Sequence, residues 1–195
     1  MITPEQIRQW NQELREQPPG AITRWAIAQA AGHAIVSTNF RPYEAVILHL
    51  ATTAQPDIPV LWVDHGFNRP ATYRHAEALR ARLKLNLRAY LPRVSAAHYL
   101  ALYETPPAPD DEAALREFSQ VFKLEPFERG MHEWAPAVWL TALRRSQNPH
   151  RAELDIVTLD PRWGALRVSP LFHQDDAALE AYLHANQLPN EWDYH

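Results

Sequence analysis

Three groups of polar residues in this sequence have side chains suited to binding anions or nucleotides. The first is the turn Ser37-Thr38-Asn39, which follows the apolar run 34–36 and precedes Arg41 and Pro42. Hydroxyls and the unpartnered N–H groups at a helix start can bind phosphate, and the helix dipole favours negative charge there. We expect a helix to begin at Pro42, since proline at the first helical position gives up no hydrogen bond. The pattern is compatible with a phosphate-binding turn, but on its own it is more typical of an ordinary connection capped by Asn39 or Ser37.

The second group, Asp64-His65-Gly66, directly follows the apolar run 58–63. The Asp64 carboxylate can accept a hydrogen bond from a ribose hydroxyl or from an exocyclic amine of a base. The alternative is that Asp64 caps the helix that follows.

The third group is basic and consists of Arg144, Arg145, Gln147, His150 and Arg151. Planar guanidinium groups match phosphate oxygens and can bind them through paired hydrogen bonds. A solvent-exposed basic patch is the alternative interpretation of such a short run of charges.

The composition excludes several kinds of site. The 195 residues contain no cysteine, so disulfides, thiolate nucleophiles, Fe–S clusters and cysteine-bound zinc are excluded within them. The ten histidines include no pair with the spacing of a zinc protease, and we expect neither a metal nor another cofactor. The net charge of −4 gives no electrostatic basis for binding nucleic acid or an anionic membrane. No apolar run approaches the ~20 residues that span a bilayer. The N-terminus does not resemble a secretory signal, so we expect a cytoplasmic protein.

The elements that must position the three groups alternate between strand and helix. The sequence predicts the following strands: 34–36, 58–63, 85–91, 138–143, and a hairpin of 155–159 with 165–168. It predicts helices over 2–16 and 21–31, then from Pro42, and over 70–83, 94–103, 112–122, 125–134 and 175–186.

This alternation is typical of an α/β fold, in which a doubly wound, mostly parallel sheet is flanked by helices. We expect one domain over 1–195, with N-terminal helices in 1–32 and a proline-rich linker or mobile loop at 105–111. Ligands of such sheets bind outside the carboxyl ends of the strands, so the three polar groups should meet at that rim.

Five segments, in this order along the chain, resemble motifs of the 3′-phosphoadenylyl-sulfate (PAPS) reductases, which are adenine-nucleotide α-hydrolase-like proteins. The family's phosphate turn Ser-Ser-Ser-Phe-Gly is similar to 37–41, and its Val-Asp-Thr-Gly-Tyr…Glu-Thr-Tyr is similar to 63–67 with 71–73. Its Lys-Val-x-Pro is similar to the sequence Lys123-Leu124-Glu125-Pro126, which precedes Arg129. Its Gly-x-Arg-Arg-x-Gln-Ser-x-x-Arg is similar to 142–151, and its Leu-Lys-Val-x-Pro to 166–170.

The resemblance implies an adenine nucleotide lying across the carboxyl rim of the sheet. Its phosphosulfate would lie near Ser37 and Thr38, and its base near Asp64, with Gly66 among the nucleotide-binding residues. Its charged groups would lie near Lys123, Arg144, Arg145 and Arg151. The resemblance also implies a homodimer and a role in sulfate assimilation, with thioredoxin or glutaredoxin as the reductant.

The sequence also departs from the family pattern. The reductases use the cysteine of a C-terminal Glu-Cys-Gly-Leu-His segment, which is missing here. Without a thiolate, neither the thiosulfonate intermediate nor its resolution by thioredoxin is possible in this chain. Arg41 replaces the glycine of the phosphate turn, and Gln174 replaces a tryptophan.

We therefore expect a PAPS-reductase-like protein that binds an adenine nucleotide or sulfonucleotide and has an accessory or regulatory role, with another sulfur-assimilation protein as a candidate partner. One alternative is an adenylyl-transfer enzyme of the ATP-pyrophosphatase type, although Asn39 and Arg41 depart from the glycine-rich turn of those enzymes. Another is a structural dimer whose pocket binds nothing.

Overall fold

The computed structural model describes residues 2–193, which form a six-stranded sheet with the order β3-β2-β1-β4-β6-β5. All neighbouring strands are parallel except β5 and β6, which form the antiparallel hairpin predicted at 155–168. The strands are β1 (Ala34–Thr38), β2 (Pro59–Val63), β3 (Asn86–Tyr90), β4 (Val138–Leu140), β5 (Val157–Leu159) and β6 (Leu166–Val168). The expectation of an α/β fold with a mostly parallel sheet is therefore confirmed.

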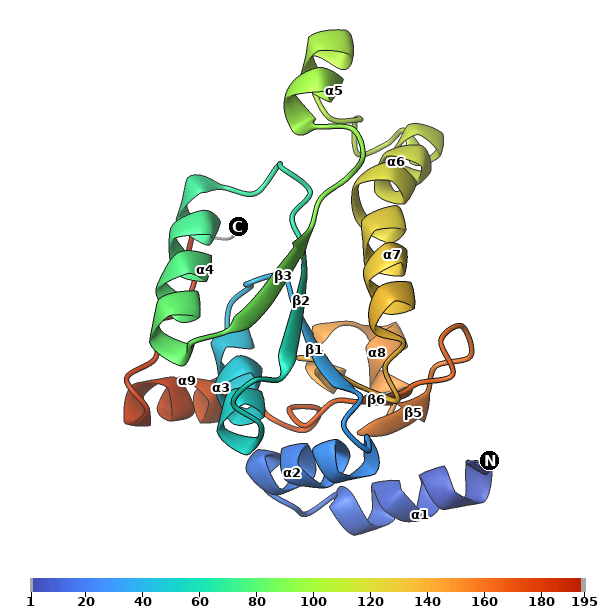
Figure 1. The fold of residues 1–195 in the computed structure, drawn as a ribbon, viewed down its shortest axis with the longest axis vertical. Helices are drawn as coiled ribbons and strands as arrows, with labels where there is room; N and C mark the ends of the chain where they lie inside the picture. Colours follow the sequence, from blue (N-terminus) through green and yellow to red (C-terminus); the bar gives the residue numbers. More distant parts are fainter. Residues whose placement is uncertain (1, 194–195) are drawn as a thin grey trace.

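Helices lie on both sides of this sheet (Figure 1). They are α1 (Pro4–Leu14), α2 (Pro19–Gln29), α3 (Glu44–Ala54), α4 (Pro70–Leu83), α5 (Ala96–Tyr103), α6 (Glu112–Ser119), α7 (Glu125–Trp134), α8 (Pro149–Ala152) and α9 (Asp176–Ala185). The larger core joins one sheet face to α2, α3, α4 and α9. The smaller core lies on the opposite face, where Met131 of α7 packs on Ile35 and Leu61.

The central strands are almost continuously apolar because both of their faces are covered. In β1 the residues Ala34, Ile35 and Val36 are buried, and in β2 Pro59 is the first residue, where a missing N–H costs the sheet little. Helix α3 has seven buried residues, because β1 covers one side of it and the helices α2, α4 and α9 cover others.

Helix α1 covers the outer edge of the sheet at β5. The buried side chain of Asn11 donates from Nδ2 to the carbonyl of Val157 at 2.9 Å and accepts from the N–H of the same residue at 2.8 Å. The amide group thus forms the pair of hydrogen bonds that a neighbouring strand would otherwise form. Thr3 caps α1 as its sequence predicts, in a reciprocal arrangement with Gln6.

Two predictions about helix boundaries are wrong. The helix after β1 begins at Glu44 and not at Pro42, and its N-cap is Tyr43, whose φ of 68° is left-handed. Neither Asn39 nor Ser37 caps it. The helices predicted at 112–122 and 125–134 are joined by a π-helical segment, Gln120–Leu124, which carries the chain from α6 into α7 (Figure 1).

Helix α5 projects from the end of the molecule beyond β3, and it has no buried residue (Figure 1). Its exposed apolar side chains include Leu102 and Tyr103. The proline-rich stretch 105–111 connects α5 to α6. No helix among residues 2–193 is long and apolar enough to cross a membrane.

Candidate functional site

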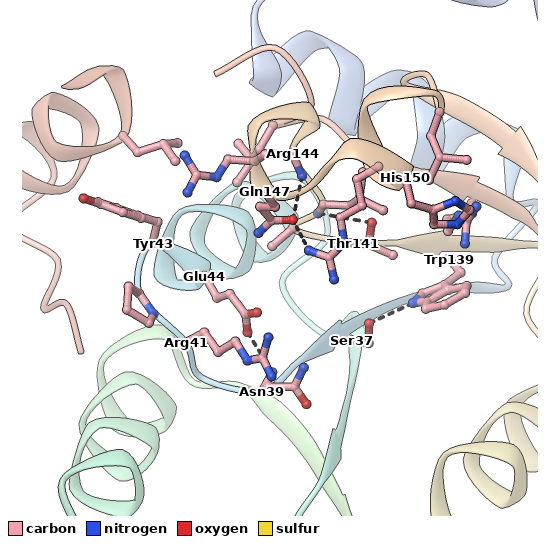
Figure 2. Close-up of a pocket in the computed structure, with 18 residues that line it drawn as sticks. Ser37, Asn39, Arg41, Tyr43, Glu44, Trp139, Thr141, Arg144, Gln147 and His150 are labelled. Atoms are coloured by element: carbon pink, nitrogen blue, oxygen red, sulfur yellow. Dashed lines mark hydrogen bonds between the residues drawn. The ribbon is translucent and has the colours of Figure 1, made fainter. Parts of the chain in front are cut away.

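A cavity of about 340 Å³ opens where the loop after β1 faces the segment after β4 (Figure 2). The chain leaves β1 toward β2 on one side, whereas β4 lies on the other side of β1. The cavity therefore lies at the switch point of the sheet, where α/β folds bind their ligands. Six of the residues predicted to bind a nucleotide line it, namely Ser37, Asn39, Arg41, Arg144, Gln147 and Arg151.

The loop after β1 is arranged around the carboxylate of Glu44. One carboxylate oxygen accepts hydrogen bonds from the backbone N–H of Asn39 at 2.7 Å and from the hydroxyl of Thr38 at 2.8 Å. The backbone of Arg41 also hydrogen-bonds to this carboxylate. The same Thr38 hydroxyl accepts from the N–H of Phe40 at 2.9 Å.

Burial raises the pKa of Glu44, and the hydrogen bonds from Asn39, Thr38 and Arg41 offset part of that rise. Thr38, which the sequence predicts as a ligand for phosphate, is buried and points its hydroxyl at Glu44. It does not line the cavity.

Ser37 connects the two sides of the site. Its Oγ accepts a hydrogen bond of 2.8 Å from the indole N–H of Trp139 on β4 (Figure 2). Trp139 is paired in register with Arg167 of β6, whose guanidinium lies 5.9 Å from the indole ring centroid. Polar and aromatic side chains of three neighbouring strands, β1, β4 and β6, therefore form the floor of the cavity.

Four arginines line the cavity, at positions 41, 144, 151 and 167. Arg144 forms an ion pair with Asp176 and stacks over the Tyr43 ring, 5.2 Å from its centroid. Arg167 lies 3.8 Å from a carboxylate oxygen of Asp160.

Arg151 differs from Arg144 and Arg167, because no carboxylate of residues 2–193 lies within ion-pair distance of it. Its guanidinium donates to the side-chain oxygen of Gln147. Burial and the nearby charges of Arg41 and Arg167 lower the pKa of Arg151, while Glu44 raises it. A partly buried cation among other cations is stabilised by an anionic ligand.

The Asp64 group lies apart from this cavity, at the end of β2. Asp64 accepts from the Tyr73 hydroxyl at 2.7 Å, from Asn68 Nδ2 at 3.2 Å and from the Gly66 N–H at 3.1 Å. Burial and the hydrogen bond to Asp64 raise the pKa of Tyr73 to about 12. The alternative that Asp64 caps α4 is wrong, because the N-cap of α4 is Arg69.

The remaining predicted residues have other surroundings. Gly66 has a φ of +78°, and a Cβ there would lie 2.9 Å from that of Ala96, so this glycine is needed for close packing. Lys123 and Arg145 are exposed and do not line the cavity. Burial and the nearby charge of Lys123 lower the pKa of His65. Among residues 2–193, no cluster of three or more metal-binding side chains is present.

The structure adds Glu44, Trp139 and Arg167 to the site. Strand alternation could have indicated the last two, since Ile35, Trp139 and Arg167 are register partners on β1, β4 and β6. Nothing in the sequence indicated Glu44, because its contact depends on the helix starting two residues later than predicted.

Comparison with known proteins places the chain in a family. The family model for the phosphoadenosine phosphosulfate reductase domain matches residues 33–191. This chain belongs to the PAPS reductase family. It is 37% identical over 179 residues to the phosphoadenosine 5′-phosphosulfate reductase of a Synechococcus species, covering 92% of this chain and 76% of that protein. It is 36% identical over 177 residues to the corresponding Synechocystis protein, covering 91% of this chain and 70% of that protein.

Solved structures agree on the fold. A PAPS reductase from Candida auris, crystallised as a phosphate complex, superposes with a TM-score of 0.83 at 23% identity, covering 98% of this chain and 90% of that chain. An FMN adenylyltransferase from Candida glabrata superposes with a TM-score of 0.60 at 15% identity, covering 98% of this chain and 61% of that chain. Both likenesses concern the fold alone, and the adenylyl-transfer alternative is not favoured. Membership of the PAPS reductase family supports a function in sulfate assimilation.

Proposed function

We propose that this chain binds an adenine nucleotide or sulfonucleotide in the cavity between β1 and β4, and that it does not by itself reduce the sulfur of a sulfonucleotide. In this proposal it acts as an accessory or regulatory member of the PAPS reductase family. The observation that carries the binding proposal is the partly buried Arg151, which lacks a carboxylate partner among the described residues and faces a cavity at the switch point.

The chemistry of the cavity supports an anionic ligand. Four arginines and His150 line it, against one carboxylate, that of Glu44. Guanidinium groups bind phosphate and sulfate oxygens through directed, charge-assisted hydrogen bonds. The polar group around Asp64 lies at the end of the neighbouring strand β2, and we assign to it the base or ribose of the nucleotide.

The absence of thiols supports the second half of the proposal. The 195 residues contain no cysteine, so they offer no thiolate to attack the sulfur of a sulfonucleotide. Reduction in the manner of the family would need a thiol that these 195 residues do not supply. The homodimer implied by the resemblance remains a prediction, which size-exclusion chromatography with light scattering tests.

A thermal-shift series with PAPS, adenosine 3′,5′-bisphosphate, AMP and ATP tests the binding. A ligand present at about 100 times its Kd stabilises the folded state by about 2.7 kcal/mol, which is a readily measured rise in Tm. We expect a rise with at least one of the adenosine phosphates that is lost in Arg151→Ala. No rise with any of the four would contradict the binding proposal.

The reductase half is tested with the purified chain, PAPS and a dithiol, by measuring sulfite. We expect no sulfite above the rate without protein. Sulfite production that depends on this chain alone would overturn the accessory role while leaving the binding proposal intact.

A further inference from the structure

The carboxylate of Glu44 accepts hydrogen bonds from the loop after β1. Two backbone groups, of Asn39 and Arg41, and the hydroxyl of Thr38 hydrogen-bond to this carboxylate. Consecutive backbone N–H groups beside a helix start are the usual protein groups that hold a phosphate or sulfate oxygen. Here they hold an oxygen of the protein itself.

The contact is local and is built into the helix. Glu44 is the first residue of α3, so its side chain has only to turn back over residues 38–41 to reach these donors (Figure 2). The left-handed Tyr43 at the N-cap allows the sharp entry into the helix, and its N–H donates to Asn190 Oδ1 at 2.7 Å. The backbone of the loop is thus held from both sides with the carboxylate inside.

A second anion cannot share these donors. A sulfate or phosphate oxygen at the same N–H groups would have to displace the carboxylate or lie directly against it, and two like charges in contact strongly oppose one another. On the other side of the cavity, Arg151 has no such carboxylate partner among residues 2–193. The geometry therefore contrasts a loop whose donors are already hydrogen-bonded to a carboxylate with an arginine that has no carboxylate partner among the described residues.

We propose that Glu44 is a specificity-determining residue that fills the oxyanion position of the loop after β1, so that a ligand's sulfate or phosphate is excluded from the loop and binds at the Arg151 side of the cavity. The identity of the full ligand rests on the proposed function. The role of Glu44 does not, because it is tested with inorganic sulfate alone.

The test compares sulfate affinity in wild type, Glu44→Gln and Glu44→Ala by isothermal titration calorimetry at constant ionic strength. Glu44→Gln retains an oxygen that accepts from Asn39 and Thr38 but removes the charge, and Glu44→Ala empties the position. We expect both variants to bind sulfate at least about tenfold more tightly, because both remove a negative charge from the wall of the cavity that would hold a dianion. Glu77→Gln removes one acidic charge on the exposed surface of α4 and should leave the affinity unchanged.

A second measurement uses only the wild-type protein, and so does not depend on whether the variants fold. In a ¹⁵N NMR titration with sodium sulfate, the amide resonances of Asn39 and Arg41 should shift less at saturation than the side-chain Nε resonance of Arg151. A larger saturable shift of the Asn39 amide than of the Arg151 Nε in wild type, or unchanged sulfate affinity in folded Glu44→Gln, would overturn the proposal.

The two proposals fail in different ways. Tighter sulfate binding by the Glu44 variants, with no thermal shift by any adenosine phosphate, would reject the nucleotide and retain the role of Glu44. Nucleotide binding with no change in sulfate affinity between wild type and Glu44→Gln would retain the nucleotide and reject the role of Glu44.

Discussion

The two walls of the cavity differ in the partners of their hydrogen-bond donors. In the loop after β1, the donors at Thr38, Asn39 and Arg41 hold the carboxylate of Glu44. In the segment after β4, Arg151 is partly buried and bonded to a neutral amide, that of Gln147. A loop that matches a family's phosphate turn in sequence can therefore have its hydrogen-bond donors satisfied within the protein. In our proposal, the anion binds instead to side chains on the opposite wall.

The largest effect that this comparison predicts is on binding by Arg151. Arg151→Ala should weaken binding of sulfate, or of any nucleotide that binds, by about 30-fold or more, because a hydrogen bond to a charged group contributes about 1.5–3 kcal/mol. Isothermal titration calorimetry measures it. Arg145→Ala is the matched control, since Arg145 is also basic and lies nearby but is exposed and outside the cavity.

Equal losses in the two variants would show that general positive charge, and not the position of Arg151, attracts the anion. Arg151→Lys sharpens the result further. It keeps the charge but not the planar guanidinium, so partial retention of affinity separates charge from hydrogen-bond geometry.

The second prediction concerns the loop after β1 and affects stability more than binding. Thr38→Val should lower the free energy of unfolding by about 1–3 kcal/mol, because it leaves the Phe40 N–H without its acceptor and removes a donor from Glu44. Urea unfolding measures it. Thr52→Val is the control, since the hydroxyl of this buried threonine donates only to backbone carbonyls of its own helix.

The third prediction concerns the bridge between the two walls. Ser37→Ala removes the acceptor of the Trp139 indole N–H and should lower the free energy of unfolding by about 1 kcal/mol. A change in Trp139 fluorescence should accompany it. A loss of ligand affinity as large as that of Arg151→Ala would show that the ligand bonds to Ser37 directly, and the contrast between the walls would then be wrong.

The smallest predicted effect is on pH dependence. The pKa of Glu44 is raised above its ordinary value of 4.5 in the folded protein, so the folded state retains this proton after the unfolded chain has lost it. The contribution of Glu44 to the free energy of unfolding should therefore fall as the pH rises from about 4.5 through the raised pKa, and stay constant above it. Glu44→Gln lacks this titration, so its stability relative to wild type should increase over the same interval. Parallel stability curves for the two proteins would contradict the raised pKa.

Much of the fold followed from the sequence because its signals are local. The apolar run 58–63 became β2, and the helix predicted at 70–83 has those limits in α4. The rim location of the site also followed, since the carboxyl ends of parallel strands meet at one edge. For this reason, six of the residues predicted to bind a nucleotide line one cavity.

What the sequence could not indicate depends on side-chain direction and on small shifts in boundaries. Pro42 is a plausible first residue of a helix, but the left-handed Tyr43 delays the helix to Glu44 and turns that carboxylate onto the loop. The pairing of Arg144 with Asp176 joins residues from distant parts of the chain. Such contacts leave no periodic pattern, so Arg144 and Arg151 looked equivalent when only one of them is paired with an acid.

The amide of Asn11 at the far edge of the sheet has a consequence for how this protein behaves in solution. This amide hydrogen-bonds to both the N–H and the carbonyl of Val157, which point outward from the edge strand β5. An uncovered strand of this kind templates the addition of another chain, and folded proteins protect such strands from it. Deletion of α1 would therefore expose the backbone hydrogen-bonding groups of the edge strand β5. We expect self-association through this strand at protein concentrations where ligand binding is still intact.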